Sequence, residues 1–432
     1  MSKATWPTRP IGDLFHISAG KTMSAKAREG LQRTPFLRTS NVFWDEIDLS
    51  NIDEMSISDN ELVSKSLQKG DLLVCEGGDI GRAAVWMGER EVMSFQNHLH
   101  RLRPKTNLTC SRFYVYFLQC GFTQLGIYAG AGNKTTIPNL SCNRLAVLEV
   151  PLPPLNEQRA ITNSLAMVRN GLNTHLKAEN LAQELKAAWM QQLFARGLRG
   201  ETQKETEIGL MPESWDVDRL GAHHSVVSGG IPSRSNPAFW SGGTIPWTKT
   251  TEVNYCVISQ TEEHITPEGL SGSAAKLLPA GTLLLAMYGQ GITRGRVAIL
   301  GIEAACNQAC AAITPKDNAV VTKYLYHFLT WRYEAIRELA HGGQQQNLNL
   351  DIVRDLQIAY PTDPDEQQEI IEILDAIDQK IALHQQKESV LDELFRSLLN
   401  KLMTGEVSVE GLDLSALTAE EPQPKTGAEV QS

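Results

Sequence analysis

The sharpest hydrophobic pattern in the sequence is a seam of apolar positions near the C-terminal end, at alternating spacings of four and three. Its members are Ile370, Leu374, Ile377, Ile381, His384, Leu391, Phe395, Leu398 and Leu402, with Glu388 filling the remaining position. A heptad seam of this length is typical of a coiled-coil helix. A shorter seam comprises Ile161, Leu165, Val168, Leu172 and His175. Beyond it the apolar stripe moves to a neighbouring face of the helix.

A helix with a single apolar stripe needs a partner to cover that stripe. We therefore predict that the two seam helices pair with each other as an antiparallel coiled coil. His175 and His384 fall near the midpoints, and each is followed four residues later by a glutamate. Two interpretations of this polar layer stay open. It either fixes the register of the pair or drifts toward solvent.

Shorter patterns show that the sequence contains an internal repeat of two copies. GDLLV at 70–74 returns as GTLLL at 281–285, and FLRTS at 36–40 returns as WTKTT at 247–251. The offset stays close to about 210 residues along the whole chain, in the same order. Each half mixes short apolar strands with glycine turns, then passes through a proline step into a long helix. We predict an α+β fold made by tandem duplication with pseudo-two-fold symmetry.

The proline steps give the domain boundaries. PLPPLNEQRAIT at 151–162 and its copy YPTDPDEQQEII at 360–371 are stiff, extended segments that lead into the helices. The predicted organisation is a first domain at 1–154, a helix at 155–197, a linker at 198–212, a second domain at 213–364, a helix at 365–404 and an acidic, disordered tail at 405–432.

Charge and cysteine content change this picture only slightly. The net charge is −10, and the whole acidic excess lies in residues 365–432, so the two domains are free to carry basic patches. The seven scattered cysteines suit reduced thiols in a cytoplasm. Neither a signal peptide nor a membrane span is expected.

A search for catalytic motifs finds no H-E-x-x-H and no G-x-S-x-G in the sequence. Pro153 and Pro154 form the one Pro-Pro pair, and it lacks the flanking residues that an amino-methyltransferase would need. We predict no catalytic residue, no metal site and no cofactor of the chain's own.

Polar side chains suited to base edges and phosphates cluster instead in glycine-containing loops. In the first domain these candidate DNA-binding residues are Lys21, Arg38, Thr39, Ser40, Arg82, Gln96, Asn97, Lys134, Thr135 and Thr136. In the second they are Lys249, Thr250, Thr251, Gln290, Arg294, Arg296, Asn307, Gln308, Gln344, Gln345, Gln346 and Asn347. The two copies differ most at these loops, as reading two different DNA sequences would require.

The chain resembles the specificity (S) subunits of type I restriction-modification systems over nearly its whole length. The resemblance rests on PLPPLNEQRAI and its copy DPDEQQEII, on the long helix after each, and on the join LFARGLRGETQKETEIGLMPESWDVDRLG at 193–221. The second copy lacks the double proline and is one residue shorter.

The resemblance implies a non-catalytic subunit with two target recognition domains. Each would read one half of a split, asymmetric site on double-stranded DNA, and the paired helices would set the spacer between the halves. It also implies two modification (methyltransferase) subunits that bring S-adenosylmethionine, and restriction subunits that use ATP and magnesium for translocation and cleavage. The expected role is defence against foreign DNA in the cytoplasm, through DNA methylation and restriction.

Two other functions remain open from the residues alone. One is a coiled-coil scaffold with two protein-binding heads and no DNA readout. The other is a self-contained DNA-modifying enzyme, for which the purified chain would methylate DNA when supplied with S-adenosylmethionine.

Overall fold

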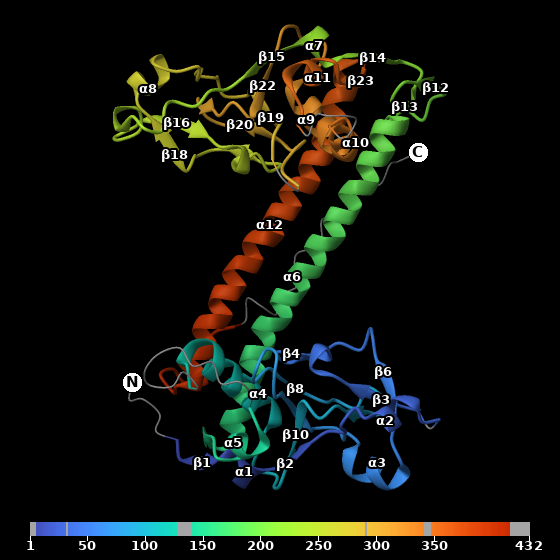
Figure 1. The fold of residues 1–432 in the computed structure, drawn as a ribbon, viewed down its shortest axis with the longest axis vertical. Helices are drawn as coiled ribbons and strands as arrows, with labels where there is room; N and C mark the ends of the chain where they lie inside the picture. The colour runs from blue at the N-terminus through green and yellow to red at the C-terminus, as the bar shows by residue number, and fades with distance from the viewer. Residues whose placement is uncertain (1–5, 32, 128–139, 290–291, 341–346, 415–432) are drawn as a thin grey trace, which may run out of the picture. The chain divides into compact units, whose positions relative to one another are not determined.

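The computed structural model describes residues 6–31, 33–127, 140–289, 292–340 and 347–414. The chain divides into two compact units, which we call unit 1 (Met1–Leu176 with Gln386–Ser432) and unit 2 (Lys177–Gln385). Two long helices, α6 (Leu155–Arg196) and α12 (Pro364–Met403), each contribute one segment to each unit. Each unit therefore contains one mixed domain and a short stretch of paired helix (Figure 1).

Unit 1 is built on a four-stranded sheet, β2-β10-β7-β8, and a three-stranded sheet, β6-β3-β9. The strands of the first are Phe15–Ala19, Leu99–Pro104, Leu72–Cys75 and Ala83–Val85, and those of the second are Asp53–Ser56, Arg33–Leu37 and Ser94–Phe95. Two short pairings are β1 (Thr8–Pro10) with β11 (Glu149–Pro151) and β4 (Val42–Phe43) with β5 (Glu46–Ile47). The helices are α1 (Ile11–Leu14), α2 (Ala25–Glu29), η1 (Thr39–Asn41), α3 (Asp59–Lys65), α4 (Ser111–Cys120), η2 (Gly121–Leu125) and α5 (Cys142–Ala146).

Unit 2 is built on a five-stranded sheet, β15-β22-β19-β20-β17, and a three-stranded sheet, β18-β16-β21. The strands of the first are His224–Ser228, Cys310–Pro315, Leu283–Ala286, Val297–Leu300 and Val257–Ile258, and those of the second are Glu263–Ile265, Ile245–Thr248 and Ala305–Cys306. Strand β14 (Trp215–Arg219) pairs with β23 (Gln357–Pro361). The helices are α7 (Leu220–His223), η3 (Pro237–Phe239), η4 (Thr250–Glu252), α8 (Pro267–Ser271), α9 (Thr322–Trp331), α10 (Tyr333–Glu338) and α11 (Leu350–Arg354).

The strand orders of the two units correspond element by element. Strands β2, β10, β7 and β8 match β15, β22, β19 and β20, and the β6-β3-β9 sheet matches β18-β16-β21, with one antiparallel and one parallel pairing in each. The predicted α+β fold with an internal duplication is therefore confirmed. Unit 2 adds β17, which pairs in parallel with β20.

Buried apolar runs place the long helices against the larger sheets. All four residues of β7 and of β19 are buried, which explains why these strands read as continuous apolar runs. In unit 1 the same core holds α4 together with Ile161, Leu165 and Phe395 of the long helices. In unit 2 the corresponding core holds α9 together with Phe194, Ile370 and Leu374.

The two long helices run antiparallel where they meet. In unit 2, Glu179 accepts a hydrogen bond from Gln385 at 2.7 Å, and Lys186 pairs with Asp378 at 2.6 Å, so the numbering rises on one helix as it falls on the other. In unit 1 the early part of α6 shares a core with the late part of α12. The predicted antiparallel pairing of the two seam helices is thus present in both units.

Two segments differ in detail from the sequence-based expectation. Residues 198–212, expected as a linker, contain an antiparallel hairpin of β12 (Gln203–Thr206) and β13 (Gly209–Pro212). The tail was expected to be disordered from residue 405, but its first part forms η5 (Val409–Gly411), and Val409, Leu412 and Leu414 pack on the core of unit 1. The reason is that these three aliphatic side chains cover apolar surface of unit 1, so this part of the tail is held by packing.

Candidate functional site

The smaller sheet of unit 1 brings four of the predicted DNA-binding residues together. Strands β3 and β9 run parallel with Leu37 opposite Phe95, so Arg38 and Gln96 follow at neighbouring strand ends. The Gln96 amide donates to the Leu37 carbonyl at 2.9 Å. Lys21 donates its backbone N–H to Phe95 and accepts from Asn97 at 3.0 Å. We call this group, Lys21, Arg38, Gln96 and Asn97, corner 1.

The smaller sheet of unit 2 builds the same arrangement, which we call corner 2 and define as Lys249, Thr250, Asn307 and Gln308. Thr248 lies opposite Cys306 in the parallel pair, and the Asn307 amide donates to the Thr248 carbonyl at 3.1 Å. The Asn307 side-chain amide also donates to the Thr250 hydroxyl at 2.8 Å. Asn307 is thereby fixed beside Lys249, while Gln308 is exposed.

Each corner depends on one glycine at which two backbones come unusually close. A Cβ on Gly20 would lie 2.2 Å from the Phe95 carbonyl oxygen, and a Cβ on Gly229 would lie 2.1 Å from that of Cys306. No side chain fits at such distances, so glycine is required at both positions. The two glycines occupy matching places after β2 and β15.

The cations of both corners already face carboxylates within the chain. Lys21 pairs with Glu61, Arg38 with Asp53 at 2.8 Å, and Lys249 with Glu262 and with Glu263 at 3.4 Å. The contacts with Glu262, and then with Glu263, raise the pKa of Lys249, while Lys21 lowers the pKa of Glu61. The corners are therefore patterned with both signs of charge rather than uniformly basic.

The predicted arginines of the glycine turns, Arg82 and Arg296, are held by contacts within their own units. Arg82 donates to Asp79 at 2.7 Å and to the Thr39 carbonyl at 2.8 Å, and it stacks on Phe43. Arg296 donates to Asn254 at 2.6 Å and stacks on Tyr255. Arg294 was also expected to contact DNA, but only 9% of it is exposed, and this burial places it in the interior of unit 2.

The remaining candidates divide between exposed positions and positions outside the described residues. Ser40, Thr251 and Asn347 are exposed, and Thr39 is half-buried. Lys134, Thr135, Thr136, Gln290, Gln344, Gln345 and Gln346 lie outside the described residues. Among the described residues, corners 1 and 2 are the places where several of the candidates lie together.

A buried glutamine clamps each domain to the start of its long helix. Gln158 donates to the Leu108 and Pro153 carbonyls at 3.1 and 2.8 Å and accepts from the Cys110 amide at 2.8 Å. Gln367 donates to the Ala319 and Pro361 carbonyls at 2.7 and 2.9 Å and accepts from the Val321 amide at 2.9 Å. Both side chains are essentially inaccessible to solvent.

A tryptophan–glutamate contact accompanies each clamp. The Trp6 indole donates to Glu157 at 3.2 Å, and the Trp215 indole donates to Glu366 at 3.4 Å. The EQ dipeptide was noticed in the sequence only as a mark of the repeat, and the tryptophans were missed. The signal was present, because both tryptophans precede their EQ dipeptide by the same number of residues.

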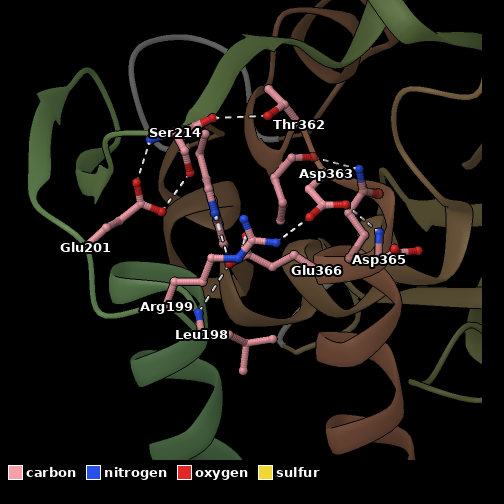
Figure 2. Close-up of polar contacts among 11 residues, drawn as sticks. Leu198, Arg199, Glu201, Ser214, Thr362, Asp363, Asp365 and Glu366 are labelled. Carbon is pink, nitrogen blue, oxygen red and sulfur yellow. Dashed lines mark hydrogen bonds and ion pairs between the residues drawn. The ribbon is translucent and has the colours of Figure 1, made fainter.

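The joint of unit 2 carries further polar contacts, shown in Figure 2. Arg199 pairs with Asp363 and lies 3.7 Å from Glu366, which also accepts from the Leu198 amide at 3.2 Å. The Arg199 contact lowers the pKa of Asp363. These bonds attach the end of α6 to the beginning of α12.

The predicted seam residues are mostly covered. Buried members are Ile161, Leu165, Val168, Ile370, Leu374, His384, Leu391, Phe395, Leu398 and Leu402; half-buried members are Leu172, His175, Ile377 and Ile381. His384 is therefore inside rather than solvated, which favours the first of the two interpretations of the polar layer. His175 is only partly covered.

His327, Asp375 and Asp378 form a group whose side-chain atoms lie close enough to hold a metal ion. Lys323 pairs with Asp375 at 3.2 Å and Lys186 with Asp378 at 2.6 Å. Because two ammonium groups already balance the two carboxylates, the group is an ion-pair network rather than a site with charge left for a cation.

A family model for the type I restriction modification DNA specificity domain matches residues 3–186 and 212–393. The type I restriction enzyme MjaVIII specificity subunit of Methanocaldococcus jannaschii is 23% identical over 421 residues, covering 94% of each chain. The Escherichia coli EcoR124I/EcoR124II specificity subunit is 28% identical over 240 residues, 53% of this chain and 55% of that one. A crystal structure of the S subunit from M. genitalium superposes with a TM-score of 0.59 at 18% identity, covering 92% of this chain and 96% of that one.

The chain contains two copies of one module, and each copy is a mixed domain followed by a long helix. With the two helices antiparallel, this arrangement defines a protein of the duplicated specificity-subunit class. The chain belongs to the family of type I restriction-modification DNA specificity subunits. It is accordingly the non-catalytic component that gives such a complex its DNA specificity. Within the described part of the chain, no helix is both long and apolar enough to cross a membrane.

Proposed function

We propose that unit 1 and unit 2 each read one half of a bipartite, asymmetric site on double-stranded DNA, through corner 1 and corner 2. The observation that carries this proposal is the recurrence of the same corner geometry with different side chains. Gln96-Asn97 in one unit corresponds to Asn307-Gln308 in the other, and Arg38 corresponds to Lys249. Amide side chains suit adenine edges, and cations suit guanine edges and phosphates.

The long helices set the unread spacer between the two half-sites. Each helix is continuous through both units, and the Gln158 and Gln367 clamps fix each domain to a helix start by three hydrogen bonds. A stiff, clamped connection is what a fixed spacer needs.

Two modification subunits bind the helix pair and supply methyl transfer. A stripe of apolar side chains on α6 supports this docking: Leu181, Leu185 and Trp189 are 67, 49 and 39% exposed at spacings of four residues. Such a stripe is costly to leave in water and is suited to a partner helix. Restriction subunits join this complex in the cytoplasm, where S-adenosylmethionine, ATP and magnesium belong to the partners.

The experiment that tests this function is methylome sequencing of the host with and without the gene. Loss of one bipartite methylated motif on deletion is expected, and its return on complementation completes the test. An unchanged methylome contradicts the proposal. The purified chain alone should show no methyl transfer from S-adenosylmethionine, because it is the non-catalytic subunit.

Docking has its own test, because it depends on a different surface. Leu185→Asp should abolish co-purification with the modification subunits, since an acid replaces the centre of the apolar stripe. Asn180→Asp, exposed on another face of the same helix, is the matched control and should co-purify normally. Equal co-purification of both variants would show that the partners bind elsewhere.

A further inference from the structure

Beside each corner, the neighbouring strand carries a carboxylate at the same register. Asp53 on β6 lies opposite Phe36, two residues before Arg38, and Glu263 on β18 lies opposite Trp247, two residues before Lys249. The resulting pairs are Arg38–Asp53 at 2.8 Å and Lys249–Glu263 at 3.4 Å, and Lys249 also pairs with Glu262, which precedes β18. In Figure 1 these strands lie in the smaller sheet of each unit, on the side of the larger sheet away from the long helices.

Folding stability does not explain these pairs. The two side chains of the first pair are 37 and 45% exposed, and those of the second are each 28% exposed. Exposed ion pairs contribute little to stability because solvent screens them. Yet the opposite charges meet at one register in both units although all four residues differ in type between the copies.

We propose that each pair reads one G·C base pair, with the cation at the guanine edge and the carboxylate at the cytosine amino group. In the major groove guanine presents two acceptors, N7 and O6, and cytosine presents one donor, N4–H₂. A cation beside a carboxylate is complementary to this order, because the cation donates to the guanine acceptors and the carboxylate accepts from the cytosine amino group. The carboxylate thus restricts specificity as well as holding the cation. In an A·T pair the cytosine amino group is replaced by the thymine O4 acceptor, to which a carboxylate cannot donate, and a carboxylate also repels phosphate.

The surroundings of the two ion pairs predict that they discriminate between base pairs to different degrees. Arg38 has a planar guanidinium that can bind guanine N7 and O6 together, whereas Lys249 offers a single ammonium group. Glu263 also accepts from Arg234 at 2.5 Å, and Arg234 stacks 3.7 Å above the Trp240 ring. Arg234 therefore holds Glu263 in place while Lys249 approaches the base. We expect tighter discrimination at the unit 1 position than at the unit 2 position.

This inference rests on the proposed function, and a graded methylome experiment separates the two. The host carries the modification subunits with the wild-type chain, Asp53→Asn or Glu263→Gln. The wild-type motif should contain at least one G·C pair in each half. Asp53→Asn should relax discrimination at one position of one half-site by at least about fivefold, the lower range for a lost base contact. Glu263→Gln should relax one position of the other half.

Matched controls distinguish recognition from general damage. Glu54→Gln changes the next, exposed acid on β6, and Glu268→Gln changes an exposed acid on α8. Both should retain the wild-type motif, and a purely structural role for Asp53 would lower methylation at all sites equally without changing the motif. Where Asp53→Asn folds poorly, Arg38→Gln should relax the same position.

Three results overturn the inference while leaving the proposed function intact: a half-site without a G·C pair, an unchanged motif in both carboxylate variants, or relaxation of both halves by one variant. Absence of any motif that depends on the wild-type chain would instead contradict the proposed function itself.

Discussion

Units 1 and 2 hold their long helices by the same clamp but surround it with opposite placements of charge. In unit 1 the acid is on the domain: Arg112 donates to Asp45 at 2.7 Å, and the Tyr116 hydroxyl donates to it at 2.5 Å. In unit 2 the acid is on the helix: Asp375 of α12 pairs with Lys323 at 3.2 Å and with His327 at 2.9 Å.

The matching positions show how the exchange occurred. Arg112 and Tyr116 correspond to Lys323 and His327 along α4 and α9, so the cation stays on the domain helix in both units. The carboxylate is what differs in position, because it is on the domain in unit 1 and on the long helix in unit 2. Duplicated backbones thus keep a clamp that depends on main-chain groups, while side-chain pairs are free to be rebuilt as long as each buried charge finds a partner.

The largest expected effect comes from breaking the shared clamp. Gln158→Ala and Gln367→Ala each leave two carbonyls and one amide without their partner, so each should lower the free energy of unfolding by about 3 kcal/mol. Chemical denaturation measures this, with exposed Gln386→Ala and Gln192→Ala as controls for the two units. A large loss in one unit and none in the other would show that the clamps are not equivalent.

The exchanged carboxylates should separate the two units. Asp45→Asn removes the acceptor of Arg112 and Tyr116, and only 3% of that side chain is exposed, so a loss of about 2–3 kcal/mol is expected. Asp375 has 27% of its side chain exposed, so Asp375→Asn should cost about 1 kcal/mol. Hydrogen exchange of α4 and α9 measures the two losses locally. Equal losses would contradict the assignment.

Acid should weaken unit 2 through a buried histidine whose position in unit 1 is taken by a phenylalanine. His224 in β15 occupies the place of Phe15 in β2, and burial lowers its pKa from 6.5 to about 4. Between pH 6.5 and pH 4 the unfolded chain protonates His224 and the folded chain does not. The contribution of His224 to the free energy of unfolding is therefore fully present above pH 6.5 and is lost as pH falls toward 4. At pH 5 the loss is about 2 kcal/mol.

His224→Phe should remove this dependence on pH and stabilise unit 2 most at pH 5. The measurement is urea denaturation at pH 7 and pH 5, with exposed His98→Phe in unit 1 as the control. A pH slope unchanged by His224→Phe would assign the acid sensitivity to other groups.

The smallest difference concerns the tryptophans. Trp215 is fully buried and Trp6 is partly exposed. Trp215→Phe should therefore cost about 1–2 kcal/mol, since Glu366 loses a donor inside the core, whereas Trp6→Phe should cost less than about 1 kcal/mol. Thermal unfolding of the two variants compares them directly. A larger effect at Trp6 would reverse the expected order.

Periodicity and repetition were enough to predict the fold. The heptad seam and the glycine-plus-aliphatic strands have few competing interpretations, so the paired helices and the duplication followed from them. Only the first part of the tail differs from the expectation, because its acidic composition masked Val409, Leu412 and Leu414, which pack on unit 1.

The candidate site was only partly accessible to sequence reasoning. Residues next to strand ends, such as Arg38 and Gln96, could be named, but the parallel register that joins them could not. Gln158 was overlooked because a glutamine in a helix gives no sign of burial. Arg294 was chosen for its charge, and only the structure shows it to be buried. The pairing of Asp53 with Arg38 and of Glu263 with Lys249 also depends on strand register, so the sequence carries no signal of it.

The most direct test of two independent readers is to sequence the methylome of hosts carrying alanine variants of one corner at a time. Gln96→Ala with Asn97→Ala should relax one half of the methylated motif and leave the other half and the spacer length unchanged. Asn307→Ala with Gln308→Ala should do the reverse. Relaxation of both halves by either variant, with the fold intact, would contradict the assignment of one half-site to each unit.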